Sequence, residues 1–129
     1  MSSLRPVPDR RGTQDQSPSV GRSAIVSEYI EGYDVVHVFG EVDLFTSPDL
    51  ERAVADAAKG SETQFVVVDF TECHYLDSTT LSVLVRAKKA LPDRLRIVVP
   101  PDLPIRRLFE ITNLAGVLDV SSTVELAIR

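Results

Sequence analysis

Short apolar runs alternate along this chain with stretches in which apolar residues recur every three or four positions. The clearest run is FVVVDF at residues 65–70, which is too apolar and too β-branched to be half exposed. We predict that it is a strand buried on both faces. A helical stretch follows and is ended by Leu91-Pro92-Asp93, and a second apolar run lies at residues 95–99. The pattern therefore predicts a strand–helix–strand unit with parallel strands.

Two strands and a helix are predicted ahead of this unit. Residues 23–30 and 35–39 are rich in valine and isoleucine, and the turn residues between them indicate a hairpin. Residues 47–59 have the form of a helix, with Ser47 as the expected cap and Gly60 as the expected stop. Apolar residues at helical spacing in this segment predict that one side of the helix packs on the sheet.

The remainder of the chain predicts shorter elements that complete one domain. A short helix is expected at residues 105–109, a last short strand at 117–120, and a final helix behind the capping-box motif STVE at 122–125. Together the pattern predicts a single α/β domain with a mixed sheet of about five strands and about four helices. A chain of 129 residues is long enough to bury such a core.

Residues 1–22 differ from the rest of the chain. They contain three prolines, several serines and four arginines, and no periodic apolar residues. Such a segment buries too little surface to offset its ordering entropy, so we predict a disordered tail at 1–22 and a folded domain at 23–129. The four arginines against two aspartates leave open whether the tail is a solvated leader or a basic arm for a partner.

Charge and cysteine content exclude several classes of function. The net charge of −5 argues against non-specific binding of nucleic acid or of an anionic membrane. The single cysteine, Cys73, excludes an internal disulfide and suits a reducing cytosol. No apolar run approaches the roughly 20 residues that span a bilayer, and the N-terminus lacks a signal-peptide core. We therefore expect a cytoplasmic protein.

A turn of hydroxyl residues, Asp77-Ser78-Thr79-Thr80, precedes the predicted central helix. Asp77 is the expected N-cap, because its carboxylate can accept from the free amides of the first turn. A helix N-terminus also favours a phosphate, and this one lies at the carboxyl end of a buried strand, where partner sites gather. The turn is therefore either a plain helix cap or a phosphoryl-acceptor site.

The helical period separates the two threonines of this turn. At about 100° per residue, Thr79 lies on the polar side with Ser82 and Arg86. Thr80 lies on the side of Leu84, which must face the sheet. We therefore predict that Thr80 is buried and that Thr79 is exposed, which makes Thr79 the reasonable phosphoryl acceptor.

Three motifs occur in a characteristic order: GEVDL at residues 40–44, VDF at 68–70 and YLDSTTL at 75–81. Together they resemble the STAS domain family, specifically the bacterial anti-anti-sigma factors, over residues 25–126. Members of this family tend to show a Gly-Glu-x-Asp turn after the second strand and an Asp-Ser-Ser-Gly-Leu turn at the central helix. The resemblance implies a STAS-like α/β domain that acts as a regulatory switch.

In the family, the second hydroxyl residue of the helix turn is phosphorylated by a partner kinase that is also the anti-sigma factor. The resemblance carries this role to Thr79, with Ser78 as the alternative acceptor. The chain departs from the family pattern in having threonine as the acceptor and Thr80 in place of glycine. The implied partner-binding surface comprises Gly40, Glu41, Asp43, Asp77, Ser78, Thr79, Thr80, Ser82 and Arg86.

The implied function is that of an anti-sigma factor antagonist and not of an enzyme. The unmodified chain would bind the anti-sigma serine/threonine kinase and free a sigma factor, and a phosphatase would act on the phosphorylated form. Phosphorylation adds about −1.5 to −2 charge, which would repel an acidic partner surface and desolvate poorly in an interface. We expect loss of binding with little change in fold, and a monomer or weak dimer.

Other functions are also compatible with the sequence. The domain could be a scaffold subunit of a stressosome-type signalling complex, which size-exclusion chromatography would separate from a small switch protein. An accessory STAS subunit of a transporter shares the same fold. A small hydrolase built on residues 77–80 would need a general base, and the sequence shows no histidine in a suitable context.

The histidines and the remaining acidic residue of the motifs are assigned structural roles. His37 is expected to be an exposed or satisfied strand histidine, and Asp69 to order the neighbouring loops or to help position the kinase's substrate hydroxyl. The pair Cys73-His74 lacks the further ligands of a zinc site and a third group to orient a catalytic dyad. No phosphate-binding loop or dinucleotide fingerprint is present. We therefore expect no cofactor, and ATP and magnesium would belong to the kinase.

Overall fold

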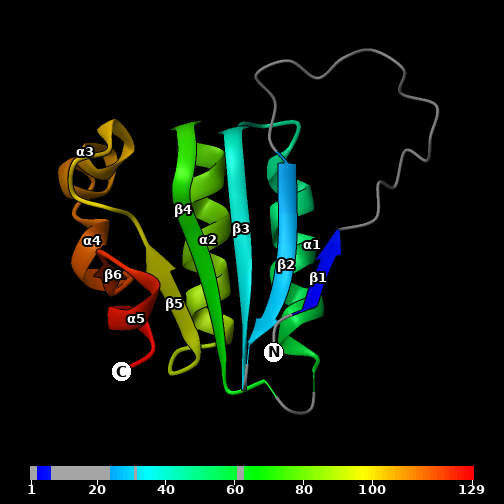
Figure 1. The fold of residues 1–129 in the computed structure, drawn as a ribbon. Coiled ribbons are helices and arrows are strands. Elements are labelled where there is room, and N and C mark those ends of the chain that lie inside the picture. Colours follow the sequence, from blue (N-terminus) through cyan, green and yellow to red (C-terminus); the bar gives the residue numbers. More distant parts are fainter. Residues whose placement is uncertain (1–2, 7–23, 31, 61–62) are drawn as a thin grey trace.

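The structure is a computed structural model that describes residues 3–6, 24–30, 32–60 and 63–129. Within these ranges six strands form one mixed sheet in the order of the chain, as Figure 1 shows. They are β1 (Ser3–Pro6), β2 (Ala24–Ile30), β3 (Tyr33–Val42), β4 (Phe65–Leu76), β5 (Leu95–Val98) and β6 (Val120–Ser121). The first three strands pair antiparallel, and β3 to β6 pair parallel. The predicted α/β fold with a mixed sheet is confirmed.

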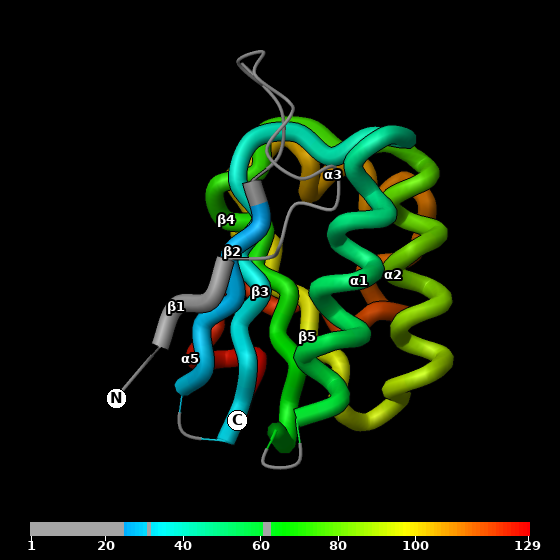
Figure 2. Tube along the Cα trace, turned by 90° about the vertical axis from the view of Figure 1, so that its right-hand side faces the viewer, coloured from blue at the N-terminus to red at the C-terminus, as the bar shows by residue number. Residues whose placement is uncertain are grey.

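Two long helices cover one face of this sheet and lie side by side in Figure 2. The helices of the described ranges are α1 (Ser47–Ala58), α2 (Ser78–Ala90), α3 (Pro104–Ile111), α4 (Leu114–Val117) and α5 (Val124–Ala127). The larger core cluster joins α1, α2 and α3 to one face of β3 and β4, and α5 packs in a smaller cluster on the opposite face. The predicted strand–helix–strand unit is the segment β4–α2–β5, and its strands are parallel.

The central strand β4 is buried on both faces over its first half. Val66, Val67 and Val68 have no measurable solvent exposure. Val66 and Val68 belong to the cluster under the long helices, while Val67 belongs to the cluster under α5. Successive side chains of a strand point to opposite faces, so a strand between two layers must be apolar throughout.

Strand β4 continues past the predicted apolar run and ends only at Leu76. The sequence predicts a strand only over residues 65–70, because the alternation of buried and exposed positions is broken over residues 71–76. The register between β3 and β4 shifts twice, once between His37 and Phe39 and once between Gly40 and Glu41. Such bulges insert an extra residue and disturb the two-residue period on which the sequence prediction rested.

Two helix caps differ from the prediction by one residue, and the last strand is displaced. The residue before α1 is Thr46, not Ser47, and Thr46 makes no side-chain cap hydrogen bond. The last helix is capped by Thr123, whose hydroxyl accepts from the amide of Leu126, and not by Ser122. The last strand, predicted at residues 117–120, is Val120–Ser121 instead, and Val117 is the last residue of α4. The two differences in cap residue are local choices between neighbouring hydroxyl residues, which periodicity does not resolve.

The N-terminal prediction differs from the structure at four residues. Ser3–Pro6 form β1, which pairs antiparallel with β2 from Ser3 opposite Tyr29 to Pro6 opposite Val26. The unpaired backbone groups at the edge of β2 can hydrogen-bond to another strand regardless of that strand's side chains. A pattern of apolar residues therefore does not predict this pairing. Residues 1–2 and 7–22 of the predicted tail lie outside the described residues. No helix of the described ranges is long and apolar enough to span a membrane.

Candidate phosphorylation and partner-binding site

Helix α2 begins at the carboxyl end of β4, and Asp77 is its N-cap as predicted. Asp77 has extended backbone angles, and its Oδ1 accepts a hydrogen bond from the amide of Thr80 at 3.1 Å. The Thr80 hydroxyl lies 3.2 Å from the same carboxylate oxygen. The carboxylate of Asp77 is therefore used to hold the first turn of α2, where amides would otherwise lack partners.

Thr80 is fully buried, which confirms the prediction from the helical period. Its hydroxyl lies 3.3 Å from the carbonyl oxygen of Val42 at the end of β3. The family resemblance implies Thr80 as part of the partner-binding surface, but a partner that docks on the outside of α2 cannot touch it. The reason is that Thr80 points under the helix, where it joins the first turn of α2 to β3.

Ser78 and Thr79 are the accessible hydroxyl residues of this turn. Ser78 is exposed, and Thr79 is partly exposed. Among the described residues, neither side-chain hydroxyl has a hydrogen-bond partner. Thr79 lies on the same side of the helix as Ser82 and Arg86, which are both exposed. The first turn of α2 therefore offers free hydroxyls to solvent, next to amides that favour an anionic group.

The connection from β3 to α1 lies beside this turn and is tightly hydrogen-bonded. We call residues 43–46 the Asp43 turn. Oδ1 of Asp43 accepts from the amides of Phe45 and Thr46 at 2.9 and 3.1 Å, and it lies 3.1 Å from the Thr46 hydroxyl. The Asp43 amide in return donates to the Thr46 hydroxyl oxygen at 2.9 Å. Asp43 thus holds the shape of the turn with its own side chain, in the manner of an Asx turn.

The other predicted surface residues flank the two turns. Gly40 has φ of +83°, a left-handed conformation that glycine adopts without strain, and Glu41 is exposed. Arg86 forms an ion pair with Glu51 of α1 at 3.3 Å, with both side chains at least half exposed. An exposed ion pair of this kind contributes about 0 to 1 kcal/mol to stability. Breaking it to bring Arg86 into another contact would therefore cost little stability.

Sequence reasoning missed the apolar tip of the Asp43 turn. The side chains of Leu44 and Phe45 are 61% and 75% exposed. Tyr75, which precedes Asp77 by two residues, is 50% exposed. The available signal was two consecutive large apolar residues inside a polar turn, at a place where no helical or strand period requires them.

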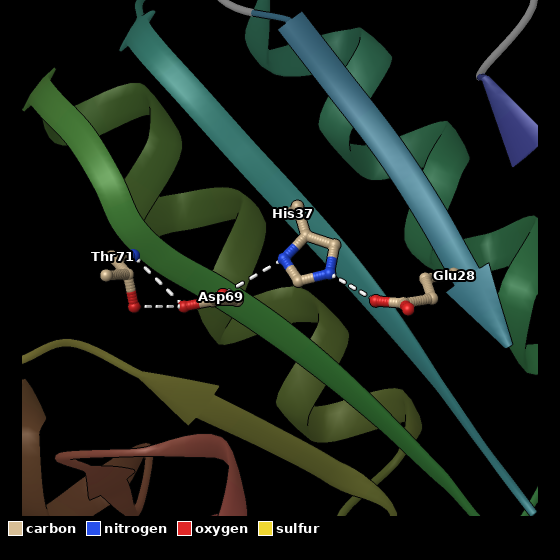
Figure 3. A network of polar contacts seen from close by, with 4 residues as sticks. All are labelled: Glu28, His37, Asp69 and Thr71. Carbon is tan, nitrogen blue, oxygen red and sulfur yellow. Dashed lines mark hydrogen bonds and ion pairs between the residues drawn. The ribbon is translucent and has the colours of Figure 1, made fainter. Parts of the chain in front are cut away.

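A second polar group lies on the sheet face opposite α1 and α2 and joins three strands (Figure 3). His37 Nδ1 lies 3.0 Å from Asp69 Oδ2, and His37 Nε2 lies 2.9 Å from Glu28 Oε1. Oδ1 of Asp69 accepts from both the amide and the hydroxyl of Thr71. His37 is therefore a satisfied strand histidine, as expected, and Asp69 orders the bulge that follows it.

The network shifts the titration of both its central groups. The hydrogen bond to Asp69 raises the pKa of His37 above its usual value; burial opposes this, and Glu28 adds to it. Burial alone would raise the pKa of Asp69, but the hydrogen bonds from His37 and Thr71 outweigh it and lower the pKa. The arrangement favours an imidazolium held between two carboxylates, and both ring nitrogens are used, which leaves neither to act as a general base.

Cys73 and His74 do not form a functional pair. Cys73 is buried, and its thiol donates to the carbonyl oxygen of Tyr75. Burial raises the pKa of Cys73 to about 11, so the reactive thiolate is disfavoured. His74 points to the exposed side of β4. Over the ranges that the structure describes, no group of three or more histidine, cysteine or acidic side chains is placed to hold a metal ion.

Comparisons with known proteins agree with the motifs. A family model described as STAS domain matches residues 24–127. The anti-sigma-B factor antagonist of Listeria monocytogenes is 36% identical over 89 residues, which cover 67% of this chain and 77% of the relative. That of Staphylococcus aureus is 33% identical over 93 residues, covering 70% and 85% of the two chains.

Solved structures share the fold at lower sequence identity. An anti-sigma factor antagonist from Mycobacterium paratuberculosis superposes with a TM-score of 0.74 at 24% identity, covering 87% of this chain and 96% of that one. The unphosphorylated form of SpoIIAA gives 0.63 at 21% identity, covering 81% and 93%. The phosphorylated form of SpoIIAA from Bacillus gives 0.57 at 21% identity, covering 81% and 96%. With a family match over residues 24–127 and curated relatives more than 30% identical, the chain belongs to the STAS domain family.

Proposed function

We propose that this chain is an anti-sigma factor antagonist that binds an anti-sigma serine/threonine kinase and is released when Thr79 is phosphorylated. The curated relatives carry the name anti-sigma-B factor antagonist, which supports the class of function. The observation that carries the proposal is the free, partly exposed hydroxyl of Thr79 at the start of α2. It lies beside the Asp43 turn, where a partner can reach it.

The geometry favours Thr79 over Thr80 as the acceptor, and the family resemblance favours Thr79 over Ser78. The hydroxyl of Thr80 is buried and engaged with Val42 and Asp77. Ser78 is exposed and, as the i−4 neighbour of Ser82, lies on the same polar side of the helix. Thr79 is preferred to Ser78 because the family resemblance assigns the modification to the second hydroxyl residue of the turn. A phosphate on Thr79 would lie at the first turn of α2, where the helix dipole and the amides favour negative charge. Ser78 stays the alternative acceptor.

Phosphorylation would switch binding without changing the fold. The Thr79 side chain makes no hydrogen bond in the described chain, so modifying it breaks none of the contacts that hold α2 in place. The phosphate adds about −1.5 to −2 charge next to the carboxylate of Asp77. Burying that charge in an interface is unfavourable, because no cation of the site is placed to pair with it except the exposed Arg86 already facing Glu51.

The switch has no catalytic role of its own in this proposal. ATP and magnesium belong to the kinase, a phosphatase restores the unmodified hydroxyl, and the exchange takes place in the cytoplasm. SpoIIAA, which shares the fold, is known in an unphosphorylated and a phosphorylated form. The two forms support the proposal that a domain of this fold can carry a phosphate without losing its fold.

The proposal is tested with the full chain and purified anti-sigma kinases of the source organism. Each kinase is incubated with the chain and Mg-ATP, and the modified residue is located by mass spectrometry. Affinity is measured by calorimetry with ADP for the unmodified chain, Thr79→Asp, Thr79→Ala and the neighbouring control Ser78→Ala. We expect phosphate on Thr79, no phosphorylation of Thr79→Ala, and at least a tenfold loss of affinity in Thr79→Asp.

Two outcomes would contradict this mechanism. Phosphate found on Ser78 alone would move the acceptor by one residue. Equal affinity of Thr79→Asp and the unmodified chain would show that negative charge at this position does not control binding.

A further inference from the structure

The described part of the chain exposes seven large hydrophobic side chains, and they are not evenly spread. Phe39, Leu44, Phe45 and Tyr75 lie on the C-terminal halves of β3 and β4 or in the turn that follows β3. Leu44 and Phe45 are consecutive, and Phe45 has the largest exposed fraction of the seven, at 75%. Single exposed apolar residues are ordinary, but two adjacent ones at the tip of a turn form a small apolar knob.

Hydrogen bonds to Asp43 hold the backbone of the turn that carries this knob. The Phe45 amide donates to the Asp43 carboxylate, and the backbone amides of Thr46 and Ser47 donate to the Asp43 carbonyl oxygen at 3.1 and 2.8 Å. Thr46 and Ser47 are themselves buried, so the turn is anchored immediately after Phe45. Because the backbone of the turn is already ordered, covering it loses less conformational entropy than covering an unstructured loop, and an aromatic side chain has only two side-chain torsions to fix.

The knob lies at the same end of the sheet as the proposed phosphorylation site. The Thr80 hydroxyl contacts the carbonyl oxygen of Val42, and Leu44 follows Val42 by two residues, or at most about 7 Å of chain. In Figure 2 the connections that enter α1 and α2 run over this same end of the molecule. A protein that covers the start of α2 would therefore also meet Leu44 and Phe45.

We infer that Leu44 and Phe45 are the hydrophobic anchors of the partner interface, and that an apolar groove of the anti-sigma kinase is their occupant. The inference rests on the proposed function and assigns the residues that supply the affinity between this chain and the kinase. Covering two large apolar side chains supplies the favourable free energy of binding to the kinase. The Thr79 hydroxyl lies at the margin of the same contact, and its phosphorylation state determines whether binding occurs. Phosphorylation leaves the anchors unchanged and places a hydrated dianion beside them, which the closed interface would have to desolvate.

The test compares the anchors with matched residues elsewhere. Leu44→Ser and Phe45→Ser are measured against Leu126→Ser, on α5 at 49% exposure, and Phe39→Ser, on the sheet face away from α1 and α2 at 40% exposure. Affinity for the purified anti-sigma kinase with ADP is determined by calorimetry on the full chain. Loss of a buried interface anchor is worth a factor on the order of 30 in Kd, whereas each control should stay within about twofold.

Thermal unfolding of each variant shows whether it is folded, and exposed anchors predict an unchanged midpoint. Phe45→Leu keeps an apolar side chain and should retain most of the affinity. If the kinase binds the unmodified chain and both anchor variants equally well, the inference is wrong while the proposed function stands. If no anti-sigma kinase binds the unmodified chain, both are wrong.

Two further results would also overturn the inference. A loss of affinity in the control variants as large as in the anchor variants would indicate unspecific adhesion. A dimer in analytical ultracentrifugation that Phe45→Ser dissociates would assign the knob to a second copy of this chain.

Discussion

The Thr80 hydroxyl lies 3.3 Å from the carbonyl oxygen of Val42, although the two residues are 38 positions apart in the chain. This contact joins the first turn of α2 to the end of β3 and brings the Asp43 turn beside Thr79. A partner that recognises both turns therefore depends on a buried group that it does not touch. The threonine that replaces the family's usual glycine is thus a structural residue here.

Replacing Thr80 by valine should destabilise the protein without changing its accessible surface. The substitution keeps the shape of the side chain and removes the hydroxyl from between Val42 and Asp77. Leaving buried polar groups without a partner costs about 1 to 3 kcal/mol. The free energy of unfolding is measured by urea denaturation. Thr79→Val is the matched control, and a loss as large in Thr79→Val would contradict the assigned difference in burial.

Asp43→Ala should loosen the turn that presents the apolar knob. The substitution removes the carboxylate oxygen that accepts from the amides of Phe45 and Thr46. Hydrogen–deuterium exchange at these two amides should accelerate by at least tenfold, a change worth about 1.4 kcal/mol of local opening. Asp43→Asn retains a side-chain oxygen acceptor and should exchange nearly as slowly as the unmodified chain. Equal acceleration in both variants would show that charge, and not the acceptor oxygen, holds the turn.

The His37 network should make stability fall as the pH rises above about 6.5. The folded pKa of His37 is raised above 6.5, so its stabilisation is complete below that value and is lost as the pH rises through the folded pKa. The folded pKa of Asp69 is lowered below 3.8, so its stabilisation is present above that value and is lost as the pH falls through the folded pKa. The contribution of the network is therefore largest between about 4 and 6.5.

The measurement is the free energy of unfolding of the unmodified chain and of His37→Gln from pH 4 to pH 9. Glutamine keeps hydrogen-bonding capacity toward Glu28 and Asp69 but carries no charge. The difference between the two proteins should shrink as the pH rises beyond 6.5. A difference that stays constant from pH 5 to pH 9 would mean that the imidazolium contributes nothing beyond its hydrogen bonds.

Contacts between distant segments account for what the sequence could not predict. The ring of His37 meets Glu28 and Asp69, which are 9 and 32 positions away, because β2, β3 and β4 lie next to one another. Because the register between β3 and β4 shifts twice, the alternation of apolar and polar residues did not predict the second half of β4. The exposure of Leu44 and Phe45 follows from how Asp43 folds its own turn, which the residue types alone do not specify.

The sequence by itself determined the features that depend on short-range periodicity and on the chemistry of helix ends. They are the parallel strand–helix–strand unit, the Asp77 cap and the burial of Thr80. These depend on the geometry of one strand or one helix, which is the same in every protein. Only the tertiary structure decided which turns adjoin, where β4 ends, and which residues form the apolar knob beside Thr79. Those features depend on strand register and on packing between segments tens of residues apart, which no local pattern encodes.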